Sequence, residues 1–308
     1  MKKNKLLFDF TNNSDSTLLL ADGVFGAAIL ADNSISTFTP ILNAKETVKI
    51  GIHDFGNVLQ AAGCSPSDTG AGTLDDKDVT VCPLDVYFSI CQKTLEQSFL
   101  SSRLAAGSNN VDFLPAEFAS YIKEKLVKTI ASNLEKAAWQ GDVLSTGSTY
   151  PNTLCDGLGY KLNADATVVD VTLTATTSSN VIANLIAVYN AIPTAVLQQP
   201  DVVIYAASNV IKAYKQALAA ASAEAYYNAK DLTLTFLGIE LVEAQLATGQ
   251  MVATYKSNLF KITDLVNDYE DVRLIPQLDK TGKHQIIVSG SMKWAVDFAV
   301  GADVVYFH

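Results

Sequence analysis

The clearest hydrophobic pattern in the chain is a repeat of about four residues across positions 115–140. Its apolar members are Phe118, Ile122, Leu126, Ile130, Leu134 and Ala138. Such a repeat traces one face of a helix. Pro115 suits a first helical position, and Gly141 suits the residue that follows a helix. The pattern predicts a long helix over 115–140, roughly 40 Å at 1.5 Å per residue, whose apolar face packs obliquely on a sheet.

Residues 41–95 predict strands around a long polar excursion. Residues 47–52 alternate between polar and apolar, as a half-buried strand does. Residues 61–78 are rich in Gly, Ser, Asp and Thr and predict a mobile loop. Alternation resumes over 79–87, where Pro83 indicates an edge or a bulge. We expect an arm-like hairpin, which is marginal alone in water and therefore rests on another surface.

Residues 1–40 contain no long periodic helix and close at Pro40. They predict an extended N-terminal arm. The basic cluster of this arm is Lys2, Lys3 and Lys5. It is interpreted either as a solvated tail or as a basic end that meets nucleic acid inside a container.

Beyond a break at Ser145–Asn152 the pattern predicts a compact α/β unit. Ser178 or Ser179 is expected to cap a helix that Pro193 ends. Its apolar side is expected to carry Ile182, Leu185, Ile186, Tyr189 and Ile192. A buried strand over 201–205 follows, and Ser208 opens a second helix that carries Ile211, Tyr214, Lys215 and Leu218 in register. Residues 232–242 and 251–255 predict further strands, with a turn at Gly249 between them.

The last forty residues predict antiparallel β structure. Two alternating runs, 272–278 and 284–289, flank a five-residue connection that contains Gly282, a typical hairpin signal. Residues 294–307 predict one or two final strands, split at Gly301. The order of elements as a whole predicts an α+β fold.

Composition favours a subunit that is covered by neighbours. Of the 308 residues, 49% are hydrophobic and only 18% are charged, whereas about 25% is typical for charged residues. The net charge of −10 argues against a dedicated nucleic-acid binder. The apolar run near the N-terminus is interrupted by Asp9 and is too short for a secretory signal. The run 18–31 is shorter than a membrane helix. We therefore expect no membrane and a protein made in a cytoplasm.

The residues that usually carry chemistry are few and scattered. The four cysteines are Cys64, Cys82, Cys91 and Cys155. They form no C-x-x-C pair, so reduced thiols are expected, with a Cys64–Cys82 bridge as the alternative in an oxidising medium.

The histidines His53, His284 and His308 show no metal-ligand spacing. His284 is interpreted as an exposed turn residue. Residues 157–159 lack a third glycine and predict a turn, and Asp75–Asp78 predicts a solvated acidic loop rather than a calcium site.

Phe113, Phe118, Tyr121 and Trp139 bracket the long helix and are interpreted as core residues, or alternatively as an interface between subunits. No catalytic, cofactor-binding or metal-binding residue is predicted, and the chain is not expected to be an enzyme.

The stretches 114–117 and 135–142, with their Gly141-Asp142 step, resemble the spine helix of tailed-bacteriophage major capsid proteins. Residues 201–205 with the Ser-capped helix, and then 237–242 with Gly249, are similar to that family's apical domain. The fold of this family is shared with herpesvirus capsid floors and encapsulins. The resemblance covers nearly the whole chain and rests on element order rather than on invariant residues.

The resemblance implies four regions. They are an N-terminal arm over 1–40, an extended loop with flanking strands over 41–95, a peripheral domain over 96–149 and 266–308 with the spine helix 115–140, and an apical domain over 150–265. It also implies a structural subunit of an icosahedral shell around double-stranded DNA, located in the virion and assembled in the host cytoplasm.

The implied partners are copies of the chain in pentamers and hexamers; scaffolding, portal and decoration proteins; and packaged DNA through weak non-specific contact. No cofactor is implied. An encapsulin-like compartment and a small-molecule-binding α+β enzyme are the alternatives.

Overall fold

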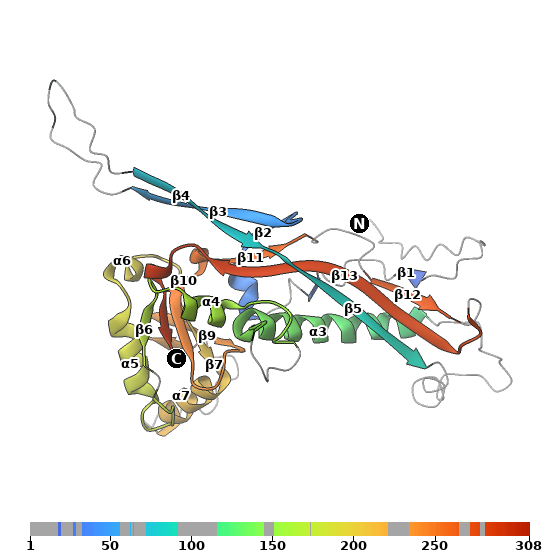
Figure 1. Ribbon diagram of the computed structural model, residues 1–308. Coiled ribbons are helices and arrows are strands. Elements are labelled where there is room, and N and C mark those ends of the chain that lie inside the picture. Colours follow the sequence, from blue (N-terminus) through green and yellow to red (C-terminus); the bar gives the residue numbers. More distant parts are fainter. Residues whose placement is uncertain are drawn as a thin grey trace, which may run out of the picture.

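The computed structural model of the chain describes most of its two sheets, its helices and the base of the arm. The described residues are 18–19, 27–28, 33–55, 62, 64, 72–91, 116–144, 151–172, 174–220, 234–264, 272–277 and 281–308. The N-terminal lysines and the centre of the 61–73 segment lie outside these ranges. Figure 1 shows a long helix and a long strand that run side by side from a mixed α/β end of the molecule.

The long helix is α3 (Ala116–Gln140), as the four-residue repeat predicts. The apolar positions 126, 130, 134 and 138 are buried, which confirms the predicted face. The helix ends at Gly141 for a reason other than a left-handed turn. A Cβ on Gly141 would lie 2.1 Å from the carbonyl oxygen of Cys155, and one on Gly157 would lie 2.5 Å from that of Ala137. Close contact between two backbones therefore requires glycine at both positions.

The α/β end is built on one mixed sheet, which we call the apical sheet. Its strands, in spatial order, are β6 (Val169–Val171), β14 (Val305–Phe307), β10 (Met251–Tyr255), β7 (Val202–Ala207), β9 (Ile239–Ala244) and β8 (Thr235–Phe236). Strand β7 is buried throughout its last five residues, as the apolar run at 201–205 predicts. The turn at Gly249 is confirmed by its positive φ of 87°.

Helices α5 (Val181–Ala191) and α7 (Ser208–Ala220) lie side by side on this sheet. Helix α7 begins at Ser208 as predicted. The predicted cap of α5 is wrong, because the N-cap residue is Asn180. The predicted core side of α5 is confirmed only in part. Leu185 and Ile192 are buried, whereas Ile182 and Ile186 are exposed, and the buried side also includes Val181, Asn184 and Val188.

Short helical elements also lie at this end. They are α4 (Leu158–Ala164), α6 (Thr194–Leu197) and η2 (Lys256–Asn258). The turn predicted at 157–159 is instead the start of α4, with Gly157 as its N-cap residue. The tight contact of Gly157 with the end of α3 explains why glycine stands there.

A second sheet runs along the spine helix, and we call it the peripheral sheet. Its strands are β1 (Leu18–Leu19), β12 (Val272–Pro276), β13 (Gln285–Phe298), β11 (Leu259–Thr263) and β2 (Thr39–Ile41), with β5 (Cys82–Cys91) along the other side of β13. The β12–β13 pairing confirms the predicted C-terminal hairpin. Pro83 lies in β5, opposite Lys293 and at the edge of this sheet, which agrees with the edge position predicted for it.

The boundaries of the sheets differ from the predicted domains in two places. Strand β14 pairs with β10 and β6 in the apical sheet, although 266–308 was assigned to the peripheral domain. Strand β11 pairs with β13 in the peripheral sheet, although residues up to 265 were assigned to the apical domain. The chain exchanges strands between the two ends because β13 is long enough to reach the apical end, after which η3 (Gly301–Asp303) turns the chain into β14.

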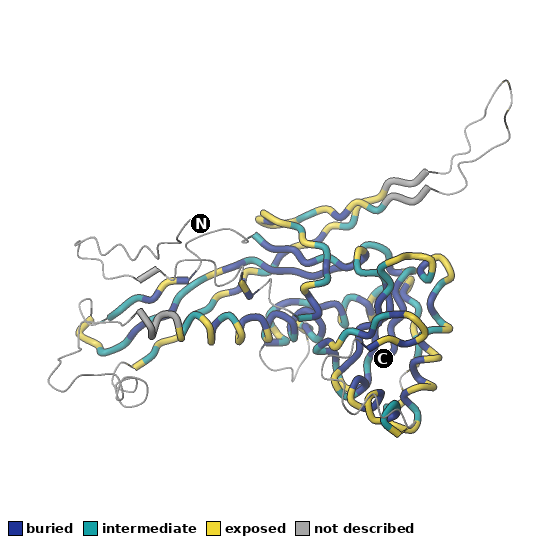
Figure 2. Tube along the Cα trace, turned by 180° about the vertical axis from the view of Figure 1, so that it is seen from behind, coloured by how far each residue is buried: buried dark blue, intermediate teal, exposed yellow. Residues whose placement is uncertain are grey.

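The buried residues form one main core that spans the apical sheet, α3 and the peripheral sheet. Figure 2 shows this distribution, with buried positions concentrated in the sheets and exposed positions on the outer helices. A smaller core lies between the hairpin and the peripheral sheet. This second core holds the base of the arm on the peripheral sheet.

Candidate functional site: the arm hairpin and its anchorage

The arm is a two-stranded hairpin of β3 (Thr47–Phe55) and β4 (Gly72–Thr80). The strands pair antiparallel from Thr47 opposite Thr80 to Phe55 opposite Gly72. In Figure 1 the hairpin begins above the peripheral sheet and runs above the apical end. The predicted strand at 47–52 is confirmed and is longer than expected.

The acidic run Asp75–Asp78 belongs to strand β4, so its prediction as a loop is wrong. Successive side chains of a strand point to opposite faces. This alternation places Lys49, Asp76 and Asp78 on the outer face of the hairpin. Lys49 lies directly opposite Asp78 and forms ion pairs with Asp76 at 3.4 Å and with Asp78 at 3.7 Å. The hydrogen bond with Asp76, together with both carboxylate charges, raises the pKa of Lys49. Cross-strand charge pairing thus allows a strand to form in a segment whose composition predicts a loop.

The inner face of the hairpin base is apolar and packs onto the peripheral sheet. The small core between them consists of Ala44, Ile50, Val79, Val81, Ile262 and Ala295. Each of these side chains is at least nine-tenths buried. The base of the arm therefore has a resting place on its own subunit.

Beyond this apolar contact the hairpin is held by a buried carboxylate. Lys77 donates to Asp297 Oδ1 at 2.6 Å and to the carbonyl of Phe298 at 3.1 Å. The ammonium group also lies over the Phe298 ring, 3.6 Å from its centroid. Lys161 of α4 donates to Asp297 Oδ2 at 2.8 Å. The side chain of Asp297 is only 5% exposed, so a single carboxylate joins the arm, β13 and α4 through charge-assisted bonds.

An open pocket of about 570 Å³ surrounds this ion-pair cluster. It lies between the hairpin base and α4 and includes Lys77, Thr80, Tyr160, Lys161 and Asp165 among its lining residues. Burial opposes ionisation of Asp165, but hydrogen bonds from Thr167 outweigh it and lower the pKa of this carboxyl. Because Asp297 holds both lysines, the pocket offers no uncommitted cation among the lining groups named here.

Two of the cysteines form a disulfide that the sequence does not predict. Cys82, at the start of β5, is bonded to Cys155, in the loop that precedes α4, with 6.1 Å between their Cα atoms. That separation suits a disulfide. The alternative Cys64–Cys82 bridge is wrong, since Cys64 is exposed and free. The root of the arm is thus joined to the body next to the ion-pair cluster.

A second extended segment, residues 33–41, is held in a different way. We call it the strap. It comprises η1 (Ser34–Thr37) and β2, and β2 pairs parallel to β11. The prediction that the extended N-terminal arm reaches residue 40 is wrong for this segment, because Ile35 and Phe38 are only 2% exposed within this subunit. The strap belongs to the body because its two large apolar side chains fill the junction of spine and apical sheet.

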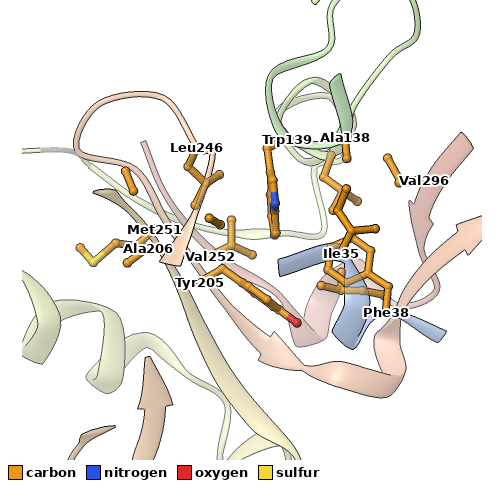
Figure 3. Packing of buried hydrophobic residues seen from close by; sticks show 14 of the residues in the cluster. Ile35, Phe38, Ala138, Trp139, Tyr205, Ala206, Leu246, Met251, Val252 and Val296 are labelled. Carbon is orange, nitrogen blue, oxygen red and sulfur yellow. The ribbon is translucent and has the colours of Figure 1, made fainter. Parts of the chain in front are cut away.

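Aromatic rings form the centre of that junction (Figure 3). The Phe38 ring lies 5.6 Å from Trp139 of α3 and 5.8 Å from Tyr205 of β7, both edge to face. Trp139 is buried, as expected for a core residue. Burial raises the pKa of Tyr205, whose hydroxyl shares a hydrogen bond with Thr37.

Four polar side chains at the junction are joined by hydrogen bonds. Trp139 donates its indole N–H to Ser34 Oγ at 2.8 Å, and Ser34 Oγ donates to Glu135 Oε1 at 2.6 Å. Gln245, which follows β9, donates to Glu135 Oε2 at 3.3 Å. A satisfied network of this kind fixes one arrangement of its parts, because each group that loses its partner remains buried. Spine, strap and apical sheet therefore form one rigid block.

Reactive side chains are scattered over the described part of the chain. In the described ranges no three His, Cys, Asp or Glu side chains are placed to hold a metal ion. His308 stacks on Tyr306 and lies 3.3 Å from Asp170, and His284 is half-buried at the hairpin turn. Burial raises the pKa of Tyr255 and of Tyr306 to about 12. Burial is the largest cause of both shifts.

Sequence reasoning missed Asp297 and its two lysines. The available signal was a lone carboxylate within the apolar run 294–300. A charged residue in a buried strand needs a partner, although the sequence does not say which lysine provides it. None of the helices described is both long and apolar enough to cross a bilayer.

The fold is similar to that of several solved shell proteins. A structure described as the satellite phage P4 procapsid including size determination (Sid) protein matches over 91% of this chain and 96% of its own, with TM-score 0.57 and 14% identity. A structure from Mycobacterium phage Adephagia matches over 88% of both chains, with TM-score 0.54 and 12% identity. The capsid of a native GTA particle matches over 99% of this chain and 96% of its own, with TM-score 0.52 and 12% identity.

Comparison of the sequence alone gives no such result. The sequence matches no protein-family profile and no curated protein. The likeness therefore lies in the arrangement of the elements along the chain and in space. The chain has the fold of phage capsid proteins.

Proposed function

We propose that this chain is the structural subunit of an icosahedral capsid that encloses the double-stranded DNA of a tailed bacteriophage. The observation that carries the proposal is the arm hairpin, in a chain whose fold is that of phage capsid proteins. Its base is anchored on its own subunit through Asp297, and its outer half extends beyond the body. An extended hairpin is marginal in water unless it packs on something, and an adjacent copy supplies that surface.

Under this proposal the arm lies across a neighbouring subunit, and the rigid block of spine, strap and apical sheet keeps its shape in every copy. Each contact is weak, but a subunit that touches several neighbours at once gains avidity. Pentamers and hexamers then differ in the angle of the arm relative to the block. Scaffolding, portal and decoration proteins are further expected partners, and the DNA touches the lumen without sequence preference.

The role is structural and not enzymatic. Structures described as a procapsid of satellite phage P4 and as the capsid of a GTA particle share this fold. The expected location is the virion, after assembly in the cytoplasm of the bacterial host.

The decisive experiment removes the outer arm and keeps its anchored base. Ile50 and Lys77 lie directly opposite each other in the hairpin. Replacing residues 51–76 by Asn-Gly joins them through a two-residue turn that suits a hairpin. The unaltered chain is expected to form closed shells by negative-stain electron microscopy. The shortened chain is expected to stay folded by circular dichroism and to form no shells.

Two results contradict the proposal. Shells that form equally well without the outer arm remove its role, and an unaltered chain that stays monomeric at high concentration removes the capsid assignment. Particles purified from the natural source distinguish a capsid from an encapsulin-like compartment. A capsid protects DNA from nuclease, whereas an encapsulin-like compartment holds protein cargo.

A further inference from the structure

Helix α5 presents an apolar face to solvent. Its outward residues are Ile182, Ala183, Ile186, Ala187 and Asn190. Ile182 and Ile186, one turn apart, are each 42% exposed. A helix that is hydrophobic on all sides is ordinarily buried on all sides, so this face of α5 is typical of a helix with a second partner.

The neighbouring helix shows what an ordinary solvent face looks like on the same sheet. Helix α7 packs beside α5 and buries Val210, Ile211 and Tyr214 toward the sheet. Its outward positions include Lys212, Lys215 and Gln216. The two helices share a sheet face and a depth of burial, so the difference between their outer faces does not come from the fold of the subunit.

The apolar face lies within a segment that carries no charge. Between Asp170 and Asp201 the sequence contains no Asp, Glu, Lys, Arg or His, although 18% of the chain is charged. Copies of a chain with net charge −10 repel each other wherever acidic faces approach. An uncharged face is where two copies can meet without that repulsion, and this favours a second copy of the chain as the occupant.

The opposite edge of the apical sheet carries a matching projection. The β8–β9 turn has Leu237 at φ 48° and Gly238 at φ 86°. Leu237 is 62% exposed. A left-handed conformation suits glycine or asparagine at a hairpin turn and is strained for a bulky residue. Strain of this kind is typical of positions selected for something other than the stability of their own subunit. No charged residue lies between Asp231 and Glu240.

The positions of the two features fit a head-to-tail contact. Helix α5 lies over the β6–β14 half of the sheet, and the Leu237 turn joins the strands of the β9–β8 edge. A contact between opposite edges of one subunit is heterologous, and such contacts close into rings when copies are related by rotation. The outer face of α5 lies on the surface away from the spine helix (Figure 1).

We infer that Leu237 of one copy packs against Ile182 and Ile186 of the next copy, and that this contact joins the apical ends of the subunits within a capsomer. The inference rests on the proposed capsid function and names the surfaces that the copies use. The occupant is a copy of the chain itself, and a decoration protein on the same face is the competing outcome.

Cross-linking tests the contact directly. The double variant Leu237→Cys/Ile186→Cys is assembled and treated with a short bismaleimide, which joins two thiols that lie close together. We expect a ladder of covalent oligomers that ends at five and six copies on a denaturing gel. Each single variant reports the background from Cys64 and Cys91, which are exposed and not in the disulfide. Leu237→Cys/Gln216→Cys is the matched control, because position 216 lies on the outer face of α7.

A charge at the contact provides the second test. Ile186→Glu is expected to lower the yield of shells at least tenfold, because an unpaired charge in a desolvated contact is strongly unfavourable. Gln216→Glu adds the same charge on α7 and is expected to leave the yield unchanged. Thermal melting of both variants shows that each subunit is folded.

The outcomes separate this inference from the capsid proposal. If the unaltered chain forms shells but the ladder matches the controls, or Ile186→Glu assembles normally, the inference is wrong and the capsid assignment stands. If Ile186→Glu shells form normally but no longer bind a decoration protein, the face serves that partner instead and the inference is again wrong. A chain that never assembles overturns both.

Discussion

The strap and the arm hairpin are both extended segments that cross the body, yet they are held by different forces. The strap places Ile35 and Phe38 in a buried aromatic core and binds through Ser34 to Trp139 and Glu135. The hairpin base rests on a small apolar cluster and on one buried carboxylate, Asp297, between two part-exposed lysines. An extended segment of the first kind is part of the block, whereas one of the second kind can tilt about its root.

The largest expected effect lies in the strap. Phe38→Ala removes a ring packed between Trp139 and Tyr205 and should lower the free energy of unfolding by about 3–5 kcal/mol. Urea denaturation measures it. Leu42→Ala, at an exposed position just past β2, is the control and should change it by less than about 0.5 kcal/mol. Equal effects of the two substitutions would show that the strap is not part of the core.

A smaller loss is expected at the root of the hairpin. Asp297→Asn leaves Lys77 and Lys161 without their shared negative charge and should cost about 2–3 kcal/mol, less than for a fully buried pair because both lysines retain some water. Hydrogen exchange at the β3 and β4 amides should accelerate more than at β2. Asp75→Asn, an exposed carboxylate on the same hairpin, should leave both readouts unchanged. Faster exchange in β2 instead would break the distinction between strap and hairpin.

The strand between the two segments offers a test by pH. In β11, Ile262 lies under the hairpin, whereas Lys261 pairs in register with Pro40 of the strap. Burial lowers the pKa of Lys261. Its charged form therefore destabilises the fold fully below the folded-state pKa, and stability is regained as the pH rises from there toward the unfolded value near ~10.4.

Lys261→Met should remove this rise and stabilise the chain by about 1 kcal/mol at neutral pH. The measurement is the difference in stability between the unaltered chain and the variant from pH 7 to pH 10. Tyr255 and Tyr306 are present in both proteins, so their titration cancels in this difference. A difference that does not change with pH would mean that Lys261 is not desolvated by the strap.

The smallest effect is expected on the outer side of the hairpin. Lys49→Met removes ion pairs with Asp76 and Asp78 whose side chains are more than half exposed. Exposed pairs of this kind contribute little to stability and are screened by salt. The loss should disappear at 1 M sodium chloride, whereas the loss from Asp297→Asn should largely persist. A salt-insensitive effect of Lys49→Met would place the outer face of the hairpin in a less solvated setting than the structure shows.

The elements that could be predicted from the sequence are those whose pattern is local. The four-residue repeat defines α3, and the run at 201–205 defines β7, because burial of one face or one strand leaves its period in the sequence. Strand β4 was missed because Asp75, Asp76 and Asp78 resemble a loop until Lys49 is placed opposite them. The position of β14 in the apical sheet was not predicted, because its pairing with β10 and β6 depends on where β13 ends.

The candidate site was less predictable than the fold. An arm-like hairpin was expected, but its anchor joins Lys77, Lys161 and Asp297, which are distant in sequence, and no periodicity reports such a meeting. The Cys82–Cys155 pairing is distant in the same way. On α5, apolar periodicity placed Ile182 and Ile186 in the core because a helix with two apolar sides gives no local sign of which side faces its own sheet.

The contact between Gly141 and Gly157 also bears on how relatives of this chain can be found. Most of the surface can drift without harm, but at these two positions the main chain itself fills the space that any side chain would need. No other residue can replace either glycine while the end of the spine helix and the start of α4 keep this backbone contact. A pair of glycines at this spacing, after a long amphipathic helix, is thus a signature to seek in divergent genomes where overall identity has faded.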